Sequence, residues 1–428
     1  MHKSARYREI QRQVDAFTEQ YGHPPRVMLF VETERTFGHA RIASTLAKRI
    51  REMGGEVIVV SGDIDEQIFD FEGTLRKLPR IDRATEGNYT PDGSLYEDRP
   101  DYQKLRTDKV MEIARDFKPD IAVFEFHPLS YNASRVPDVD AVAQYRRESG
   151  APLPIVTIAR DDCATLEFTE QRRERLKPFD HLLVEGYKEN TPTPGIVPEP
   201  EQLGHILADR PPNDHPLPSE KQPVMVFSSG GYKPSDQLFF DKAIEASKQS
   251  LFADQPWKIV LSNDCPDEVF RAFEEKARIE GSGKITVMRS YNNEDFSYDI
   301  ANCKAAIVRG SYNATLELAS QHKPFVVIPR TLRGWSYENE NRARFFSEHG
   351  IAAMITEAEL EGSDGAGKLA GKLLEATQVK PTHEIDYEDG SQFAARFLQL
   401  AMQHKQAAQV EQSSWEARGQ RRPGTMRR

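Results

Sequence analysis

The sequence predicts an α/β protein with two doubly wound domains, each built on a mostly parallel sheet with helices on both sides. Three observations predict this class. The chain has 428 residues, which suits two cores because a domain typically takes roughly 100 to 200 residues. Short apolar runs with strand character alternate with helical patterns along most of the chain. A proline-rich stretch divides this alternation into two halves.

The amino-terminal part of the chain predicts a helix followed by a βαβ unit. Residues 1–20 are charged and helix-prone, and they lack the apolar core of a signal peptide. A strand at 26–31, a helix at 42–50 and a strand at 56–60 follow. Parallel strands need a crossover connection and a cover on both faces, so this unit predicts a buried parallel sheet.

The rest of the first domain contains an insertion and three further strands. Residues 62–102 are polar and have no clear period, which is typical of an insertion with its own loops. The alternation then resumes with a helix at 104–117 and with strands at 120–126, 154–159 and 181–185. We therefore expect the first domain to occupy residues 1–188.

A linker is expected at residues 189–222, because this stretch and the residue after it are rich in proline. Proline lacks an amide donor and turns its predecessor away from the helical region, so we expect no regular structure there. The nine prolines are Pro192, Pro194, Pro198, Pro200, Pro211, Pro212, Pro216, Pro218 and Pro223.

The second domain, expected at residues 223–385, repeats the architecture of the first. Its strands are expected at 224–228, 258–261, 284–288, 305–308 and 325–328. A carboxyl-terminal helix at 386–409 follows from the helical spacing of Phe393, Phe397 and Leu400. Residues 410–428 are polar and basic, and we expect this tail to be disordered.

Composition excludes several classes of protein. The formal net charge of −10 provides no basic face for nucleic acid. No apolar run approaches the roughly 20 residues that span a bilayer. Cys163, Cys265 and Cys303 have no metal-ligand spacing, which fits core packing in a reducing compartment. We therefore expect a cytoplasmic protein that makes at most peripheral membrane contact, through the five arginines of its tail.

Two strand-to-helix turns in the second domain are suited to phosphate. Such turns expose backbone amides, and the dipole of the following helix favours an anion. At the first turn, an ordinary connection between a strand and a helix is as good an interpretation as a phosphate site. That turn consists of Ser228, Ser229, Gly230 and Gly231. The second turn and the start of its helix supply Arg309, Gly310, Ser311, Asn313, Thr315 and Glu317.

Glu317 lies one turn into the second of these helices, where a carboxylate can bind the two hydroxyls of a ribose. The alternative is a capped helix that carries an exposed glutamate. The residue type and position alone leave both interpretations open. A strand at 324–329 and a run at 338–343, Glu-Asn-Glu-Asn-Arg-Ala, follow in the same order and spacing as in a known family.

Residues 309–343 resemble the carboxyl-terminal domain of the MurG-like, family 28 glycosyltransferases, and the nearest branch is that of predicted glycosyltransferases. In that family a Gly-Gly-Tyr-Asn-Thr-type turn precedes a Glu, then Gly-Lys-Pro and a strand ending in Val-Pro, then Glu-Gln and an Asn-Arg-Ala-like run. Weaker similarity extends to residues 228–231 and to the Gly-His pair at Gly38 and His39.

The resemblance implies the GT-B fold, in which two Rossmann-like domains face each other, with the sugar nucleotide on the second and the acceptor on the first. Ser229 to Gly231 and Gly310 to Ser311 would hold the diphosphate, Glu317 the ribose, and Glu338 and Asn339 the sugar. The implied reaction is an inverting transfer from a nucleotide diphosphate, expected to be UDP, to an acceptor hydroxyl. No motif identifies the acceptor, so a lipid-linked molecule and a small molecule both remain open.

The proton acceptor of such a transfer has three candidates in the first domain. His39 begins the first helix after a strand, and an imidazole can accept a proton near neutral pH. Glu125 and His127 lie where the strand at 120–126 ends, which is the edge at which open α/β sheets bind ligands. Asp161 and Asp162 after the next strand are a weaker choice. Each of these residues can instead simply cap a helix or turn.

No metal or cofactor is expected. Asp63 and Asp65, like Asp138 and Asp140, match the Asp-x-Asp pattern that other glycosyltransferases use for manganese. We interpret both pairs as acids near helix starts. A helix dipole and backbone donors can support a leaving diphosphate without a metal.

Two alternatives to a transferase share the features of this sequence to different degrees. Ser311 replaces a usual glycine of the family and Asn339 a common glutamine, which keeps open a non-catalytic nucleotide-sugar-binding or partner subunit. A sugar-nucleotide 2-epimerase is disfavoured, because residues 310–318 do not resemble the Ser-Gly-Gly-x-x-Glu-Glu pattern of those enzymes.

Overall fold

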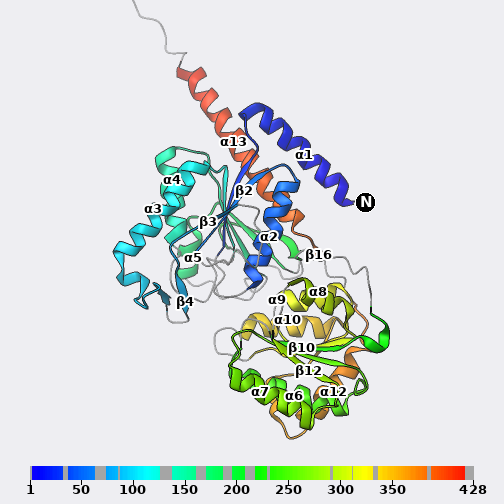
Figure 1. Cartoon of the computed structure of the whole chain (residues 1–428). Coiled ribbons are helices and arrows are strands. Elements are labelled where there is room, and N and C mark those ends of the chain that lie inside the picture. The colour runs from blue at the N-terminus through cyan, green and yellow to red at the C-terminus, as the bar shows by residue number, and fades with distance from the viewer. Residues whose placement is uncertain are drawn as a thin grey trace, which may run out of the picture. The chain divides into compact units, whose positions relative to one another are not determined.

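The structure, a computed structural model, divides into two compact units (Figure 1). The first unit comprises residues 1–34, 38–206 and 388–428, and the second comprises 35–37 and 207–387. The structure describes residues 2–31, 37–62, 74–84, 87–125, 137–160, 170–186, 195–207, 217–228, 232–289, 293–310, 312–330, 336–382 and 387–419.

The first unit is built on an eight-stranded sheet in the order β16-β9-β8-β7-β6-β1-β2-β3. The pairings from β3 through to β9 are all parallel. The strands are β1 (Arg26–Phe30), β2 (Glu56–Ser61), β3 (Leu75–Lys77), β6 (Ile121–Glu125), β7 (Ile155–Arg160), β8 (His181–Glu185), β9 (Pro200–Ile206) and β16 (Tyr387–Glu388).

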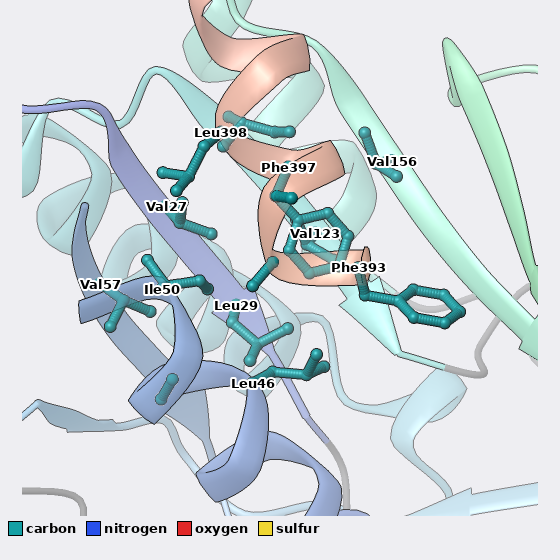
Figure 2. Close-up of a cluster of buried hydrophobic side chains, with 14 of the residues drawn as sticks. Val27, Leu29, Leu46, Ile50, Val57, Val123, Val156, Phe393, Phe397 and Leu398 are labelled. Carbon is teal, nitrogen blue, oxygen red and sulfur yellow. The ribbon is translucent and has the colours of Figure 1, made fainter. Parts of the chain in front are cut away.

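Helices cover both faces of this sheet because successive strand residues point to opposite sides. Val27 and Leu29 of β1 pack with one set of helices, and Met28 and Phe30 pack with the other. The first set is α1 (His2–Tyr21), α2 (Phe37–Glu52) and α13 (Ser391–Gly419). The second is α3 (Pro100–Phe117), α4 (Pro137–Ser149) and α5 (Glu170–Leu176). Figure 2 shows Leu398 of α13 near Val27 of β1, with Phe393 and Phe397 of the same helix in the same cluster.

The carboxyl-terminal helix α13 therefore belongs to the first unit, although the second unit precedes it in the chain. Lys405 donates to Asp120 at 2.9 Å, and Arg396 pairs with Glu201 at 2.9 Å. His404 and His181 approach each other with 3.0 Å between their Nε2 atoms. Burial lowers the pKa of both histidines, and the charge of His404 lowers that of His181 further.

The second unit is built on a six-stranded parallel sheet in the order β12-β11-β10-β13-β14-β15. Its strands are β10 (Val224–Ser228), β11 (Trp257–Leu261), β12 (Ile285–Arg289), β13 (Ala305–Arg309), β14 (Phe325–Val327) and β15 (Ala353–Met354). Its helices are α6 (Asp236–Gln249), α7 (Asp267–Glu280), α8 (Asn293–Asn302), α9 (Tyr312–Ser320), α10 (Ser336–Glu348), α11 (Glu357–Glu361) and α12 (Gly365–Ala376).

These two sheets confirm the predicted fold class. The segment between β2 and α3 contains β3, a hairpin of β4 (Asp82–Ala84) and β5 (Gly87–Tyr89), and the short helix η1 (Tyr96–Asp98). Cys265 and Cys303 are buried, as expected of core cysteines. Cys163 lies outside the described residues.

Two expectations are corrected. Strand β9 lies within the expected linker and pairs with β8. It forms there because Pro200 is its first residue, a position that proline tolerates, and the rest of the strand contains no proline. Helix α13 continues to Gly419 and so includes half of the tail that we expected to be disordered. Residues 420–428 lie outside the described residues.

Candidate functional site

The chain order of the strands defines a topological switch point in the first unit. From β1 the chain moves to β2 and β3 on one side, and it later adds β6 on the other side of β1. Ligands of open α/β sheets bind outside the carboxyl ends of the strands at such a point. Here Val31, directly after β1, and Glu125 at the end of β6 lie there, and α2 is the next helix after β1.

His39 and Glu125 meet at this switch point. His39 lies in the first turn of α2, and its Nδ1 is 3.0 Å from both carboxylate oxygens of Glu125. The carboxylate is fully buried, whereas 24% of the His39 side chain is exposed. The sequence presented the two residues as competing candidates, and the structure joins them in one pair.

The pair has the arrangement of a base and its orienting carboxylate. An ionised carboxylate only accepts hydrogen bonds, so Nδ1 carries the proton and donates a hydrogen bond to Glu125. In this tautomer the lone pair of the imidazole lies on Nε2, and the carboxylate stabilises the imidazolium that forms when Nε2 takes a proton. His127, Asp161 and Asp162 lie outside the described residues.

The second unit has an equivalent switch point between β10 and β13. From β10 the chain continues through β11 and β12 on one side and then adds β13 on the other. Ser228 ends β10 and is in register with Arg309, which ends β13. The strand ends that precede the two predicted phosphate-suited turns therefore lie side by side.

Ser228 belongs to a hydrogen-bonded network centred on Asp236, the first residue of α6. Its hydroxyl donates to Asp236 Oδ2 at 3.1 Å and accepts from Arg330 Nη2 at 2.5 Å. Arg330 Nη2 also donates to Asp236 Oδ2 at 2.9 Å, and the amide of Lys233 donates to the same oxygen at 3.1 Å. The hydroxyl of Ser228 therefore links the end of β10 to the first residue of α6 and to Arg330.

Arg309, predicted to contact the nucleotide, is buried beneath the switch point. Its guanidinium lies 3.4 Å from Asp236 Oδ1, donates to the carbonyl of Ser235 at 3.1 Å and pairs with Glu357. Burial lowers its pKa, although an arginine remains charged in any protein. These contacts indicate a structural role for Arg309 at the second switch point.

Gly310 and Asn339, 29 positions apart in the sequence, come together in space. A Cβ atom on Gly310 would lie 3.4 Å from Asn339 Cβ and 3.5 Å from Pro329 Cα. The start of α10 therefore lies close to the residue that follows β13. Ser229, Gly230, Gly231 and Ser311 lie outside the described residues, as does the side chain of Glu338.

Helix α9 presents three of the predicted site residues. Asn313 is half-buried, and Thr315 is fully buried and donates to the carbonyl of Tyr312 at 3.1 Å. Glu317 is also buried, so the exposed glutamate of the alternative interpretation is not observed. The Arg342 guanidinium lies 4.6 Å from the centre of the Tyr312 ring, which joins α10 to the start of α9.

The sequence interpretation missed Asp236 and Arg330. Two signals were available, an acid in the first turn of a helix that follows a glycine-containing segment, and an arginine directly after the Ile-Pro that follows β14. Neither signal shows that the two side chains meet, because they are 94 positions apart.

The Asp-x-Asp pair at Asp138 and Asp140 lies in the first turn of α4, as we interpreted it. Asp138 is buried and binds Arg106 through both oxygens, at 2.7 and 2.6 Å. Asp63 and Asp65 lie outside the described residues. Among the described residues, no group of three or more His, Cys, Asp or Glu side chains is arranged to hold a metal ion. None of the described helices is long and apolar enough to cross a membrane.

Comparisons with known proteins identify the fold. No protein-family model matches the chain, and a search of curated proteins finds no match. MurG of Acinetobacter baumannii is similar in structure, with a TM-score of 0.53 and 13% identity over 88% of this chain and 100% of MurG. A Listeria monocytogenes protein described as a UDP-N-acetylglucosamine 2-epimerase has a TM-score of 0.53 and 14% identity, over 87% of this chain and 94% of that protein. The rhamnosyltransferase SpnG, complexed with thymidine diphosphate, has a TM-score of 0.51 and 13% identity, over 89% of this chain and 96% of SpnG.

The two Rossmann-like units and these neighbours establish that the chain has the GT-B fold. The predicted fold class is therefore confirmed at the level of the whole chain. At identities of 13 to 14% the similarity shows the fold alone.

Proposed function

We propose that this chain is a glycosyltransferase that moves a sugar from a nucleoside diphosphate donor to an acceptor hydroxyl. The observation that carries the proposal is the His39–Glu125 pair at the first switch point, where a buried carboxylate orients an accessible imidazole. Such a pair removes a proton from a hydroxyl as it attacks. The fold is shared with glycosyltransferases, which supports the same function.

The proposed reaction is a single displacement. Nε2 of His39 takes the proton of the acceptor hydroxyl while the acceptor oxygen forms a bond to the anomeric carbon of the donor sugar. The bond from that carbon to the phosphate oxygen breaks, and the nucleoside diphosphate leaves with the electron pair. Attack from the face opposite the leaving group inverts the anomeric configuration. Glu125 stabilises the imidazolium until the proton passes to solvent.

The donor is proposed to bind at the second switch point, with the diphosphate at Ser229 to Gly231 and at Gly310 to Ser311. The amino ends of α6 and α9 follow these turns, and their dipoles favour the charge of the leaving diphosphate without a metal. Glu317 is proposed to bind the ribose. Glu338 and Asn339 are proposed to face the sugar of a UDP-linked donor.

A panel of nucleotide sugars tests this proposal. A donor present at 100 times its Kd should raise the free energy of unfolding by about 2.7 kcal/mol, which a thermal shift detects. Mass spectrometry of the stabilising donor, incubated with a cell extract, should then show the free diphosphate together with a glycosylated product. Stabilisation without turnover would instead identify a nucleotide-sugar-binding subunit.

A 2-epimerase is the second candidate, because one structural neighbour is described as such an enzyme. An epimerase changes the donor sugar without any acceptor, whereas a transferase consumes the donor only when an acceptor is present. Incubation of the donor with and without extract therefore separates the two. We expect a cytoplasmic protein whose acceptor is a lipid-linked or a small molecule.

A further inference from the structure

A carboxylate and two guanidinium groups lie together beneath the second switch point. The side chain of Asp236 is fully buried, that of Arg309 is 1% exposed, and that of Arg330 is 12% exposed. Burying a carboxylate is costly unless it is paired, so the folded unit requires these ion pairs around Asp236. Within it, Arg330 is the most accessible of the three groups.

The guanidinium of Arg330 lies at the switch point itself. Arg330 follows β14, yet it bonds Ser228 at the end of β10, and β13 lies between these strands. The residue before it, Pro329, lies beside Gly310, which follows β13, so Arg330 reaches Ser228 across the carboxyl end of β13. Gly310 lies at that end and offers no side chain to obstruct it. This is the place at which α/β sheets bind phosphate groups.

We propose that Arg330 binds the diphosphate of the donor and that Asp236 and Ser228 hold its guanidinium in position. This inference rests on the proposed function. An anion that reaches the switch point meets the guanidinium first, because the carboxylate of Asp236 is fully buried. A guanidinium donates charge-assisted hydrogen bonds to phosphate oxygens in a fixed plane, which a lysine ammonium does not. Asp236 and Ser228 fix the orientation that such a contact needs.

Calorimetry with inorganic pyrophosphate tests the inference on the full-length protein. Pyrophosphate contains the group shared by all nucleoside diphosphate donors, so the test does not depend on the base or the sugar. Arg330→Met keeps the length of the side chain and removes the charge, and Arg330→Lys keeps the charge and removes the planar fork. Arg278→Gln is the matched control, because Arg278 is an exposed arginine of the same unit in the last turn of α7.

Arg330→Met should weaken pyrophosphate binding about 10- to 150-fold, the loss expected of a charge-assisted hydrogen bond. Arg330→Lys should lose less, and Arg278→Gln should bind like the unmodified protein. Thermal melting establishes that each variant is folded, and Arg330→Lys provides the test if Arg330→Met unfolds. In that case a lysine variant that binds pyrophosphate as tightly as the unmodified protein overturns the inference.

Two other outcomes also overturn the inference about Arg330, and a third outcome distinguishes its failure from a failure of the proposed function. A folded Arg330→Met that retains full pyrophosphate affinity removes Arg330 from the site. Equal losses in the methionine and lysine variants show that Arg330 only supports the fold of the turn. An unmodified protein that binds neither pyrophosphate nor any nucleoside diphosphate refutes the proposed function as well, whereas the first two outcomes leave that function intact.

Discussion

Replacing Glu125 by glutamine should disable the proposed base while leaving the shape of the site unchanged. Glutamine has the size of glutamate but no charge, and its amide can donate to Nδ1 of His39. That bond moves the imidazole proton to Nε2, so the nitrogen that must accept a proton already carries one. The carboxylate also stabilises the imidazolium that forms as Nε2 takes the proton, and the amide does not. A positioned general base contributes about 100- to 10,000-fold to the rate, and we expect a loss near the middle of that range.

The assay is turnover of the donor identified in the nucleotide-sugar panel, with donor affinity measured separately by calorimetry. Glu125→Gln should lower turnover about 1,000-fold, and His39→Ala should lower it about 100- to 10,000-fold. Donor affinity should be unchanged in both variants, because we propose that the donor binds the other unit. The double variant should be no slower than His39→Ala alone, since residues that act as one unit are not additive.

Two results would refute the reasoning. If the two substitutions multiply in the double variant, then Glu125 and His39 act independently and the pair is not a base with its orienting group. If Glu125→Gln retains full turnover, the hydrogen bond to Nδ1 has no catalytic role, and the base must be sought at His127 or Asp161.

Three further predictions concern the nucleotide, the fold and the tail. Glu317→Ala should weaken UDP binding about 10- to 150-fold, and calorimetry that shows unchanged affinity would remove Glu317 from the site. His181 and His404 have pKa values below the unfolded value of about 6.5, so their contribution to stability is complete above that pH and is lost as the pH falls through their folded values. The fall in the free energy of unfolding between pH 8 and pH 5, measured in denaturant, should be smaller in His404→Gln than in the unmodified protein, and an equal fall would contradict this. Truncation after Val410 removes the exposed Trp415 and all five tail arginines; activity should persist, and co-sedimentation with anionic vesicles that is unchanged would exclude a membrane role.

Local patterns predicted most of the strands because their cause is local. The bounds of β8 and β10 agree with the expected 181–185 and 224–228, since each is a short apolar run that ends at a turn. Strand β9 was missed because its stability comes from pairing with β8. The sequence around it contains more prolines than a strand usually tolerates, and only the position of Pro200 at the start makes the pairing possible.

The members of the candidate site could be predicted singly but not as pairs. His39 and Glu125 were each identified from their place at a helix start or a strand end, and they are 86 positions apart. Their contact depends on β6 adding beside β1, which is a property of the whole sheet. Arg330 and Asp236 meet for the same reason, because β10, β13 and β14 are neighbours.

Burial explains why Glu317 is not the exposed helix glutamate of the alternative interpretation. A glutamate on a helix is usually exposed, but α9 is buried along nearly its whole length, between the sheet and its neighbours. A carboxylate in such a helix is retained only if a partner compensates for its lost hydration. A ligand-binding glutamate and a structural one therefore look alike in the sequence, and the UDP affinity of Glu317→Ala distinguishes the two.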